Sequence, residues 1–476
     1  MTNNFRFGLK TLAVSIALMG AVASAQAAQI QILNTNAPGV GFNDPTPATP
    51  VGGNTGTTLG EQRLIAFTYA ANIWGATLNS DVPIIINATF EPLNCTATSA
   101  TLGSAGATSV FRDFDGAPKA GTWYGGALAN KLSGVDQAAG APVIRARFNS
   151  NLGLNANCLP GSPFYLGLDA NHGSLIDFPT VLLHEMGHGV GFQTFTSGST
   201  GAQLAGFPSV WDHFMLDNRT NKLWTDMTAE ERIASAISGN GLSWTGDRVT
   251  AAAPGVLSRS PNLAVSGPAA SSIAGDYVVG EASFGPVLSI TAPVVAQVMP
   301  VVDQANGTGL ACNPLTGANA LAVRGNIAVV DRGVCAFNIK VKNAQNAGAK
   351  GVIVVDNVAA PISGLGGTDA TITIPAVRVT LADGTRLKSA LQTRSRTASG
   401  VIGSLGRSAT RFAGTDNQGR ALLYTPTTFS PGSSVSHYTT DTSRNQLMEP
   451  AISADLSHSP TLPLDLTYEL LKDIGW

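Results

Sequence analysis

The stretch that decides how this chain can be interpreted is residues 177–191, with the sequence DFPTVLLHEMGHGVG. Asp177 is a residue type favoured as a helix N-cap, and Pro179 suits the first helical turn, where the missing N–H costs nothing. Gly191 is a natural C-terminal stop, since glycine accepts the left-handed backbone that ends many helices. The sequence therefore predicts one helix over this stretch.

Two histidines and a glutamate within this helix indicate metal chemistry. Side chains four positions apart lie on one helical face, so His184 and His188 can offer ring nitrogens to the same ion. Glu185 follows the first histidine and can take a proton from a metal-activated water. This pattern predicts a hydrolytic metal site.

Two glycines in the same helix argue that it was not built for stability alone. Gly187 and Gly189 each cost roughly 1 kcal/mol relative to alanine in a helix interior. We expect another backbone or a substrate to approach the helix closely at these positions.

The composition limits the classes of protein to consider. At 476 residues the chain exceeds one ordinary hydrophobic core, which favours two or three domains. Charged residues make up 12% and glycine reaches 53 residues, which favours turn-rich and β-rich structure. With a formal net charge of −2 and no run of Lys or Arg, we expect no nucleic-acid partner.

The N-terminus has the pattern of a secretory signal peptide at residues 1–28. Arg6 and Lys10 precede an apolar run at residues 12–23, which is followed by small residues. No later segment offers the roughly 20 apolar residues of a membrane helix, so we expect no stable membrane anchor. The sequence predicts a secreted protein, periplasmic or extracellular, and indicates no particular oligomeric state.

Four cysteines in an exported chain favour two disulfides. Of the three possible connectivities, Cys95 with Cys158 and Cys312 with Cys335 keeps each pair inside one predicted domain. Metal ligation by these cysteines is the weaker alternative, because the chain has no short Cys-x-x-Cys spacing.

Hydrophobic periodicity divides the chain further. Residues 29–60 are rich in Asn, Pro, Thr and Gly and predict an N-terminal arm of doubtful order. Residues 61–273 predict the first part of a catalytic domain, with a helix from Glu61 and strands at residues 82–86 and 143–148. Residues 274–405 change to short β-branched runs, with strands at 327–330 and 351–355 around a helix at 340–348. Residues 406–476 return to the first domain and end in a closing helix at 464–476.

A hydrolytic zinc ion needs a third protein ligand from elsewhere in the chain. The position ten residues after His184 is Thr194, so the remaining candidates are His172, His213, His437, His458 and the acid Asp212. His172 is interpreted as a turn or cleft-wall residue and His458 as a solvated one.

The sequence HEMGHGVG at residues 184–191 resembles the metzincin zinc signature, and departs from it at Thr194. In the leishmanolysin-like branch of metzincins, the third histidine follows a long insertion and precedes a Met-containing turn. The resemblance implies that His437 is the third ligand and that Met448, in LMEP, forms the Met-turn. Asp212 or His213 stays open as the alternative third ligand.

The inserted segment has a resemblance of its own. RGVCAF at residues 332–337 and NAQNAGAKGVI at residues 343–353 are similar to protease-associated (PA) domains, which accompany exported peptidases. Together the two resemblances imply an α+β fold, in which a metzincin-like catalytic domain with a mixed sheet and a zinc-site helix is interrupted by a β-rich α/β PA domain.

The expected function is a secreted zinc-dependent endopeptidase acting on polypeptides, with one zinc ion on His184, His188 and His437 and with Glu185 as general base. The alternative is a non-catalytic exported PA-domain binding protein with a structural zinc site. An aminopeptidase is disfavoured, since PA-bearing aminopeptidases typically use two metals and carboxylate-rich ligand sets. Calcium is a further possibility at residues 113–116, DFDG, although a plain turn fits better because the later acidic ligands are missing.

Overall fold

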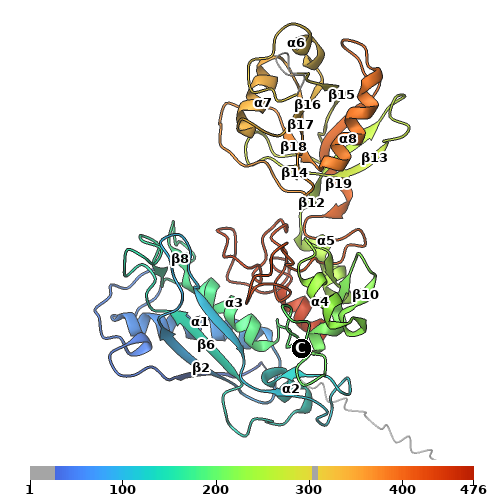
Figure 1. Ribbon diagram of the computed structural model, residues 1–476. Helices are drawn as coiled ribbons and strands as arrows, with labels where there is room; N and C mark the ends of the chain where they lie inside the picture. Colours follow the sequence, from blue (N-terminus) through green and yellow to red (C-terminus); the bar gives the residue numbers. More distant parts are fainter. Residues whose placement is uncertain (1–26, 303–308) are drawn as a thin grey trace, which may run out of the picture.

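The computed structural model describes residues 27–302 and 309–476, which form a lower body and an upper lobe (Figure 1). All but the last two residues of the predicted signal peptide lie outside the described residues. None of the helices described is long and apolar enough to cross a membrane.

The lower body is built on a four-stranded sheet with the order β1-β2-β6-β3. β1, β2 and β6 run parallel, and β3 is antiparallel to β6 at the edge. In β2 every second residue is buried, as expected for a strand with one face on a core. The strands span Ile30–Asn34 (β1), Ile84–Glu91 (β2), Gly103–Ala107 (β3) and Ile144–Asn149 (β6).

Two helices pack against this sheet and against each other. α1, Leu59–Thr77, begins with a capping box in which Thr58 and Glu61 satisfy each other's backbone N–H groups. α3, Phe178–Val190, is the helix predicted from residues 177–191. The indole N–H of Trp74 donates to the Leu183 carbonyl at 3.0 Å and ties α1 to α3.

The prediction of an N-terminal arm at residues 29–60 is wrong for part of this segment, because Ile30–Asn34 belongs to the sheet and Phe42 to the core. β1 pairs in parallel with β2 from Ile30↔Ile84 to Asn34↔Ala88. Phe42 is 2% exposed and packs edge-on against Phe90, with ring centroids 5.1 Å apart. An edge strand this short gains its order from its partner rather than from its own sequence.

A second part of the lower body combines residues 215–256 with the C-terminal helix. A three-stranded sheet has the order β10-β9-β11, and the buried Trp211, Trp224 and Trp244 join one core with the first sheet. The elements here are β9 (Met215–Asp217), β10 (Lys222–Leu223), β11 (Leu242–Trp244), α4 (Ala229–Ala236), α5 (Asp247–Val256) and α9 (Thr467–Ile474). α2 (Gly126–Ser133) and two short strand pairs complete the body: β4 (Val110–Phe111) with β5 (Tyr124–Gly125), and β7 (Phe164–Tyr165) with β8 (Ile176–Asp177).

The upper lobe contains an eight-stranded mixed sheet with the order β13-β12-β19-β15-β16-β17-β18-β14. Its strands are β12 (Arg259–Ser266), β13 (Gly275–Val278), β14 (Gly280–Glu281), β15 (Val294–Pro300), β16 (Ile327–Asp331), β17 (Gly351–Val355), β18 (Ala376–Val379) and β19 (Ile402–Phe412). Its helices are α6 (Gly317–Val323), α7 (Phe337–Asn346) and α8 (Leu381–Ala390).

The central strands of this lobe are buried on both faces, which explains their uninterrupted apolar sequences. Val329 and Ile353 contribute to a core with Leu387 of α8, whereas Val330 and Val354 contribute to a separate core with helix α7. The strands and helix predicted at residues 327–355 are therefore confirmed as β16, α7 and β17.

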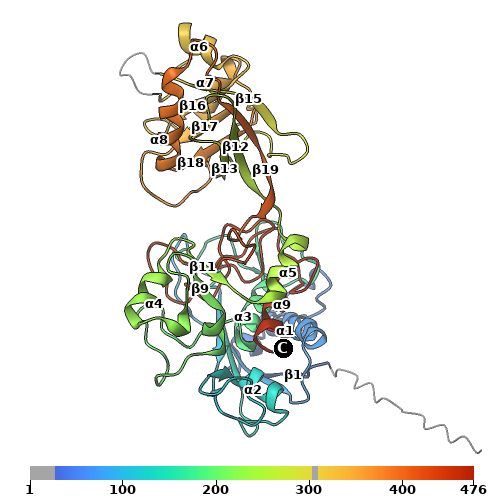
Figure 2. The ribbon, with the colours of Figure 1, turned by 90° about the vertical axis from the view of Figure 1, so that its right-hand side faces the viewer.

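The two bodies are joined by the adjacent strands β12 and β19 (Figure 2). The Ala413 N–H donates to the Ser258 carbonyl at 2.9 Å, and the Arg259 guanidinium lies 4.1 Å from the Phe412 ring centroid. Because β12 and the end of β19 belong to the upper sheet, the lobe is wider than residues 274–405.

Both predicted disulfides are present, one in each body. The Cα–Cα distances are 5.0 Å for Cys95–Cys158 and 5.8 Å for Cys312–Cys335, within the usual range. All four cysteines are thereby paired, so none is available as a metal ligand.

Candidate metal centre

Helix α3 forms as its sequence predicts and presents two imidazoles on one face. The Asp177 carboxylate accepts the Thr180 N–H at 3.0 Å as N-cap, and the helix ends at Gly191, whose φ is 137°. His184 and His188 are 7% and 8% exposed. The helix is wholly buried, so the two rings are held inside the body.

The glycines of α3 make room for neighbouring side chains. This corrects the expectation that another backbone or a substrate approaches the helix at these positions. A Cβ at Gly187 would lie 2.6 Å from Met448 Sδ, and one at Gly189 would lie 2.6 Å from Ile144 Cγ2 on β6. The helix therefore lies closer to β6 and to Met448 than any larger residue allows.

Three imidazoles meet at one point. The Nε2 atom of His188 lies 3.2 Å from that of His184 and 3.1 Å from that of His437, and the third distance is 3.3 Å. Among the described residues, these three form the one group of His, Cys, Asp or Glu side chains arranged to hold a metal ion.

Backbone carbonyls fix the tautomer of each ring. Nδ1 lies 2.7 Å from Leu447 O in His184, 2.8 Å from Phe192 O in His188 and 2.8 Å from Ser433 O in His437. A carbonyl only accepts, so each Nδ1 carries the proton and each neutral Nε2 keeps a lone pair directed at the other two. This is the donor arrangement that metal-ligating histidines show.

Burial keeps the rings neutral. Desolvation lowers the pKa of His184 to about 4 and that of His188 to about 3. The pKa of His437 is also lowered well below its usual value, first by burial and then by the neighbouring histidines. The three nitrogens are thus available as ligands at neutral pH.

The segment after His437 also helps to position His184. Met448 is fully buried against Gly187, and the carbonyl that fixes His184 belongs to the preceding residue, Leu447. Met448 therefore acts through packing, next to a carbonyl that orients a ligand.

Glu185 lies between α3 and the edge strand β3. A Cβ at Gly103 would lie 3.0 Å from Glu185 Oε1, and the carboxyl bonds to the backbone of Ala105. Burial raises the pKa of Glu185 to about 8, against smaller opposing effects of this bond and of Arg147. The carboxyl group lines the same cleft as the three histidines.

The centre opens into a cleft of about 930 Å³. Its walls come from α3, from residues 99–105 along β3, from residues 172–177, from residues 431–433 and from residues 449–454. His172 lies in the wall, in agreement with its interpretation from the sequence. None of the lining residues is a lysine or arginine.

The alternative third ligands lie elsewhere. Asp212 is fully buried and accepts hydrogen bonds from Thr194 Oγ1 at 2.6 Å and from Ser209 N at 2.9 Å. His213 Nε2 lies 3.1 Å from Thr122 Oγ1. Thr194, which stands where the metzincin signature would have its third histidine, thus anchors Asp212.

The calcium candidate at residues 113–116 forms a turn. Asp113 accepts the Gly121 N–H at 2.6 Å, which fits a plain turn.

His458 is not solvated as expected but lies at the start of the metal-site helix. Its Nε2 is 2.6 Å from Asp177 Oδ2, and its Nδ1 is 3.2 Å from the Tyr69 hydroxyl. The contact joins residues 281 positions apart, and no local pattern in the sequence signals it.

Comparisons with known proteins identify the domain in the upper lobe. Residues 290–387 match the PA domain family, so this chain contains a PA domain. No curated protein matches the chain.

Solved structures match only part of the chain. The aminopeptidase from Aneurinibacillus sp. strain AM-1 is 24% identical over 32% of this chain and 31% of its own, with a TM-score of 0.24. The zinc aminopeptidase BSAP from Bacillus subtilis is 20% identical over 33% and 35%, with a TM-score of 0.22. The psychrophilic subtilisin-like protease Apa1 from Pseudoalteromonas sp. AS-11 is 18% identical over 37% and 37%, with a TM-score of 0.24. The chain spans about a third of the length of these proteins.

Gly189→Ala tests the close approach of α3 to β6. The helix-propensity gain of about 1 kcal/mol is smaller than the roughly 1–3 kcal/mol cost of overpacking against the stiff, buried Ile144. We expect a net loss of about 1 kcal/mol in the free energy of unfolding, measured by urea denaturation. Gly255→Ala is the matched control, since Gly255 is also the penultimate residue of its helix but has open space around it, and this change should stabilise. Equal effects of the two substitutions would contradict the packing argument.

Glu185→Gln tests the burial of the carboxyl group in the metal-free protein. The pKa of Glu185 is 4.5 in the unfolded chain and about 8 in the folded one. At a pH between these two values, the carboxyl group is ionised in the unfolded chain and keeps its proton in the folded chain. The contribution of Glu185 to stability is therefore full below about pH 4.5 and is lost as the pH rises toward 8. Glutamine does not ionise, so the variant should gain up to a few kcal/mol over wild type across this range. Urea unfolding in the presence of a chelator at several pH values measures the difference in the free energy of unfolding between variant and wild type. A difference that does not change with pH would contradict the prediction.

Proposed function

We propose that this protein is a secreted zinc-dependent endopeptidase. The observation that carries the proposal is the convergence of three neutral Nε2 atoms beside a buried glutamate, at the base of an open cleft. The PA domain and the two disulfides are consistent with an exported protein that acts on polypeptides.

The three histidines fit zinc. Zn–N bonds of about 2.0–2.1 Å in tetrahedral geometry separate the ligand atoms by about 3.3 Å. The Nε2 atoms here are 3.1–3.3 Å apart. Among the described residues no fourth protein ligand joins the group, as is usual for hydrolytic zinc and unlike a closed structural site.

The proposed reaction divides between the metal and the chain. Zinc, when bound, supplies Lewis-acid polarisation of a carbonyl and makes a water molecule more acidic. Glu185 would accept the proton of the attacking water and later deliver it to the leaving amine. A nearby dication favours the carboxylate form of Glu185, which offsets the effect of burial on its pKa.

The cleft suits an extended peptide. β3 pairs with β6 on one side only within the described sheet, so its other edge offers backbone N–H and C=O groups, apart from the Ala105 group that bonds to Glu185. Gly103, Ser104 and Ala105, which have no side chain or a small one, line the cleft beside Glu185. A substrate could add to this edge as a further strand and bring its scissile bond to the metal.

Within this proposal the catalytic unit is metzincin-like, an assignment that rests on the motif at residues 184–191 with His437 and Met448. The alternative, an exported binding protein with a structural zinc, is less favoured because three ligands that open into a cleft leave room for water and substrate.

Glu185→Gln should abolish hydrolysis while preserving the metal. The amide cannot accept the water proton, so we expect casein hydrolysis to fall by at least about 100-fold, in the range typical of general-base loss. Zinc content measured on the same sample should stay near one ion per chain. Turnover close to wild type would remove Glu185 from the mechanism, whereas insensitivity of wild type to a chelator would argue against zinc.

His437→Ala should lose zinc, because two helical histidines alone hold the ion weakly. His213→Ala is the matched control, since His213 is the other histidine candidate and lies outside the group. Zinc analysis after gel filtration distinguishes them. Retention by His437→Ala together with loss by His213→Ala would transfer the third ligand to the alternative segment.

A further inference from the structure

The third ligand lies at the end of a backbone ladder. The Leu423 N–H donates to Leu242 O of β11 at 2.9 Å, and the Tyr424 N–H donates to His437 O at 2.9 Å. Residues 421–424 thus pair with β11 on one side and with the His437 segment on the other. The position of His437 along the cleft therefore depends on how the β11 region is held.

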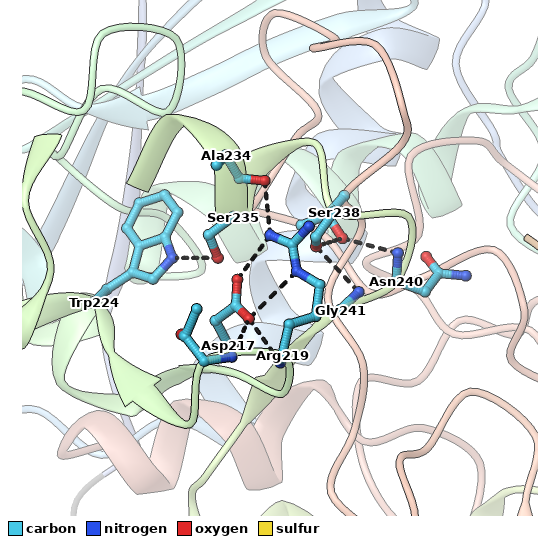
Figure 3. Close-up of polar contacts among 10 residues, drawn as sticks. Asp217, Arg219, Trp224, Ala234, Ser235, Ser238, Asn240 and Gly241 are labelled. Carbon is cyan, nitrogen blue, oxygen red and sulfur yellow. Dashed lines mark hydrogen bonds and ion pairs between the residues drawn. The ribbon is translucent and has the colours of Figure 1, made fainter. Parts of the chain in front are cut away.

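A turn at residues 238–241 leads into β11 and is itself rigidly anchored (Figure 3). Ser238 Oγ donates to Thr425 Oγ1 at 3.0 Å, and the Gly239 N–H donates to Thr425 O at 2.7 Å. The Gly241 carbonyl accepts the Asn218 N–H at 2.8 Å. The turn is thus bonded both to the ladder and to the end of β9.

An ion pair between the buried Asp217 carboxylate and the half-exposed Arg219 guanidinium lies at the β9 end of this network. Asp217, which is 1% exposed, accepts from Arg219 Nη2 at 3.0 Å and from the Arg219 N–H at 2.8 Å. The same Nη2 donates to Ala234 O at 2.9 Å, which ties in the end of α4 (Figure 3). The turn therefore has a second anchor, separate from the ladder at residues 421–424.

Asn240 connects this support to the ligand segment. Its backbone N–H donates to Thr425 Oγ1 at 3.1 Å, in a left-handed conformation with φ of 64°. Its side-chain Oδ1 accepts from Thr439 Oγ1 at 3.2 Å, and its Nδ2 donates to Asp441 Oδ2. One amide thus bridges the residues two and four positions after His437.

We propose that Asn240 is a positioning residue for the third metal ligand. The Tyr424 bond holds the carbonyl of His437, and the Asn240 amide holds the chain on its C-terminal side, so that the backbone that carries the imidazole is held at both places. Metal affinity depends on the placement of ligands to within a few tenths of an ångström, and groups that orient ligands typically affect it by 10–100-fold. This inference rests on the proposed zinc centre.

Asn240→Gly removes the amide and keeps the backbone, because glycine accepts the left-handed conformation without strain. Asn221→Gly is the matched control: Asn221 has φ of 57° in the β9–β10 turn of the same network but has no side-chain bond to the ligand segment. Zinc dissociation constants of the full-length proteins, measured by competition with a chromogenic chelator, should rise about 10-fold for Asn240→Gly and stay unchanged for Asn221→Gly.

The melting temperature of the metal-free variants separates positioning from general stability. A merely structural role would lower it for Asn240→Gly without changing the zinc dissociation constant, and that result would overturn the proposal. Thr439→Val keeps the shape and removes the hydroxyl that donates to Asn240, so it should weaken zinc in the same direction if Asn240→Gly does not fold. Unchanged affinity in Thr439→Val would then overturn the proposal.

The same measurements separate this inference from the proposed function. A wild-type chain that binds no zinc would overturn both. Tight zinc binding by wild type that is equally tight in Asn240→Gly would overturn the positioning role and leave the zinc centre intact. Loss of affinity in Asn240→Gly and Thr439→Val, with a smaller effect of the second change in the presence of the first, would support a role through their shared bond.

Discussion

Three neutral imidazoles that face one another at contact distance are the constraint on which the rest of this structure depends. Their Nε2 lone pairs repel unless a cation or a proton lies between them, and burial disfavours the proton. Each ring must therefore be held in place by the protein. Three carbonyls do so, those of Phe192, Ser433 and Leu447, and they come from two segments that are far apart in the chain. The sheet, the glycines of α3 and the returning C-terminal segment all serve to bring these carbonyls together.

Much of the fold follows from local sequence, because caps and periodicity act over a few residues. The helix at residues 177–191 and the strands and helix at residues 327–355 were predictable in this way. The two disulfide pairings followed instead from the division into domains, which keeps each pair inside one of them. β1 was not, since five residues of alternating burial among turn-forming types give little signal, and the pairing that orders them lies about fifty residues away. The start of the upper lobe was also misplaced, because Pro261 and Asn262 in β12 disguise a strand that β19 completes.

The residues of the candidate site also divide into those that local sequence predicts and those that it does not. His184, Glu185 and His188 share one helix, so their spacing alone indicated their chemistry. His437 depended on a resemblance, since no physical rule connects two positions 249 residues apart. The contact between Asp177 and His458 and the bridge made by Asn240 could not be foreseen, because each is created only when separate segments pack. The sequence also left the role of the glycines open, and the structure shows that neighbouring side chains decide it.

The neighbouring strands β12 and β19 have a consequence for how such proteins can diverge. Since the chain leaves and re-enters the lower body on adjacent hydrogen-bonded strands, the two ends of the inserted domain are only about 4.8 Å apart. For the lower body, an entire domain is geometrically equivalent to a hairpin loop. Evolution could exchange this cassette, lengthen it or delete it without moving His437 relative to His188. Relatives with the same three histidines can therefore differ widely in the number of residues between the second and third, and a search based on fixed spacing would overlook them.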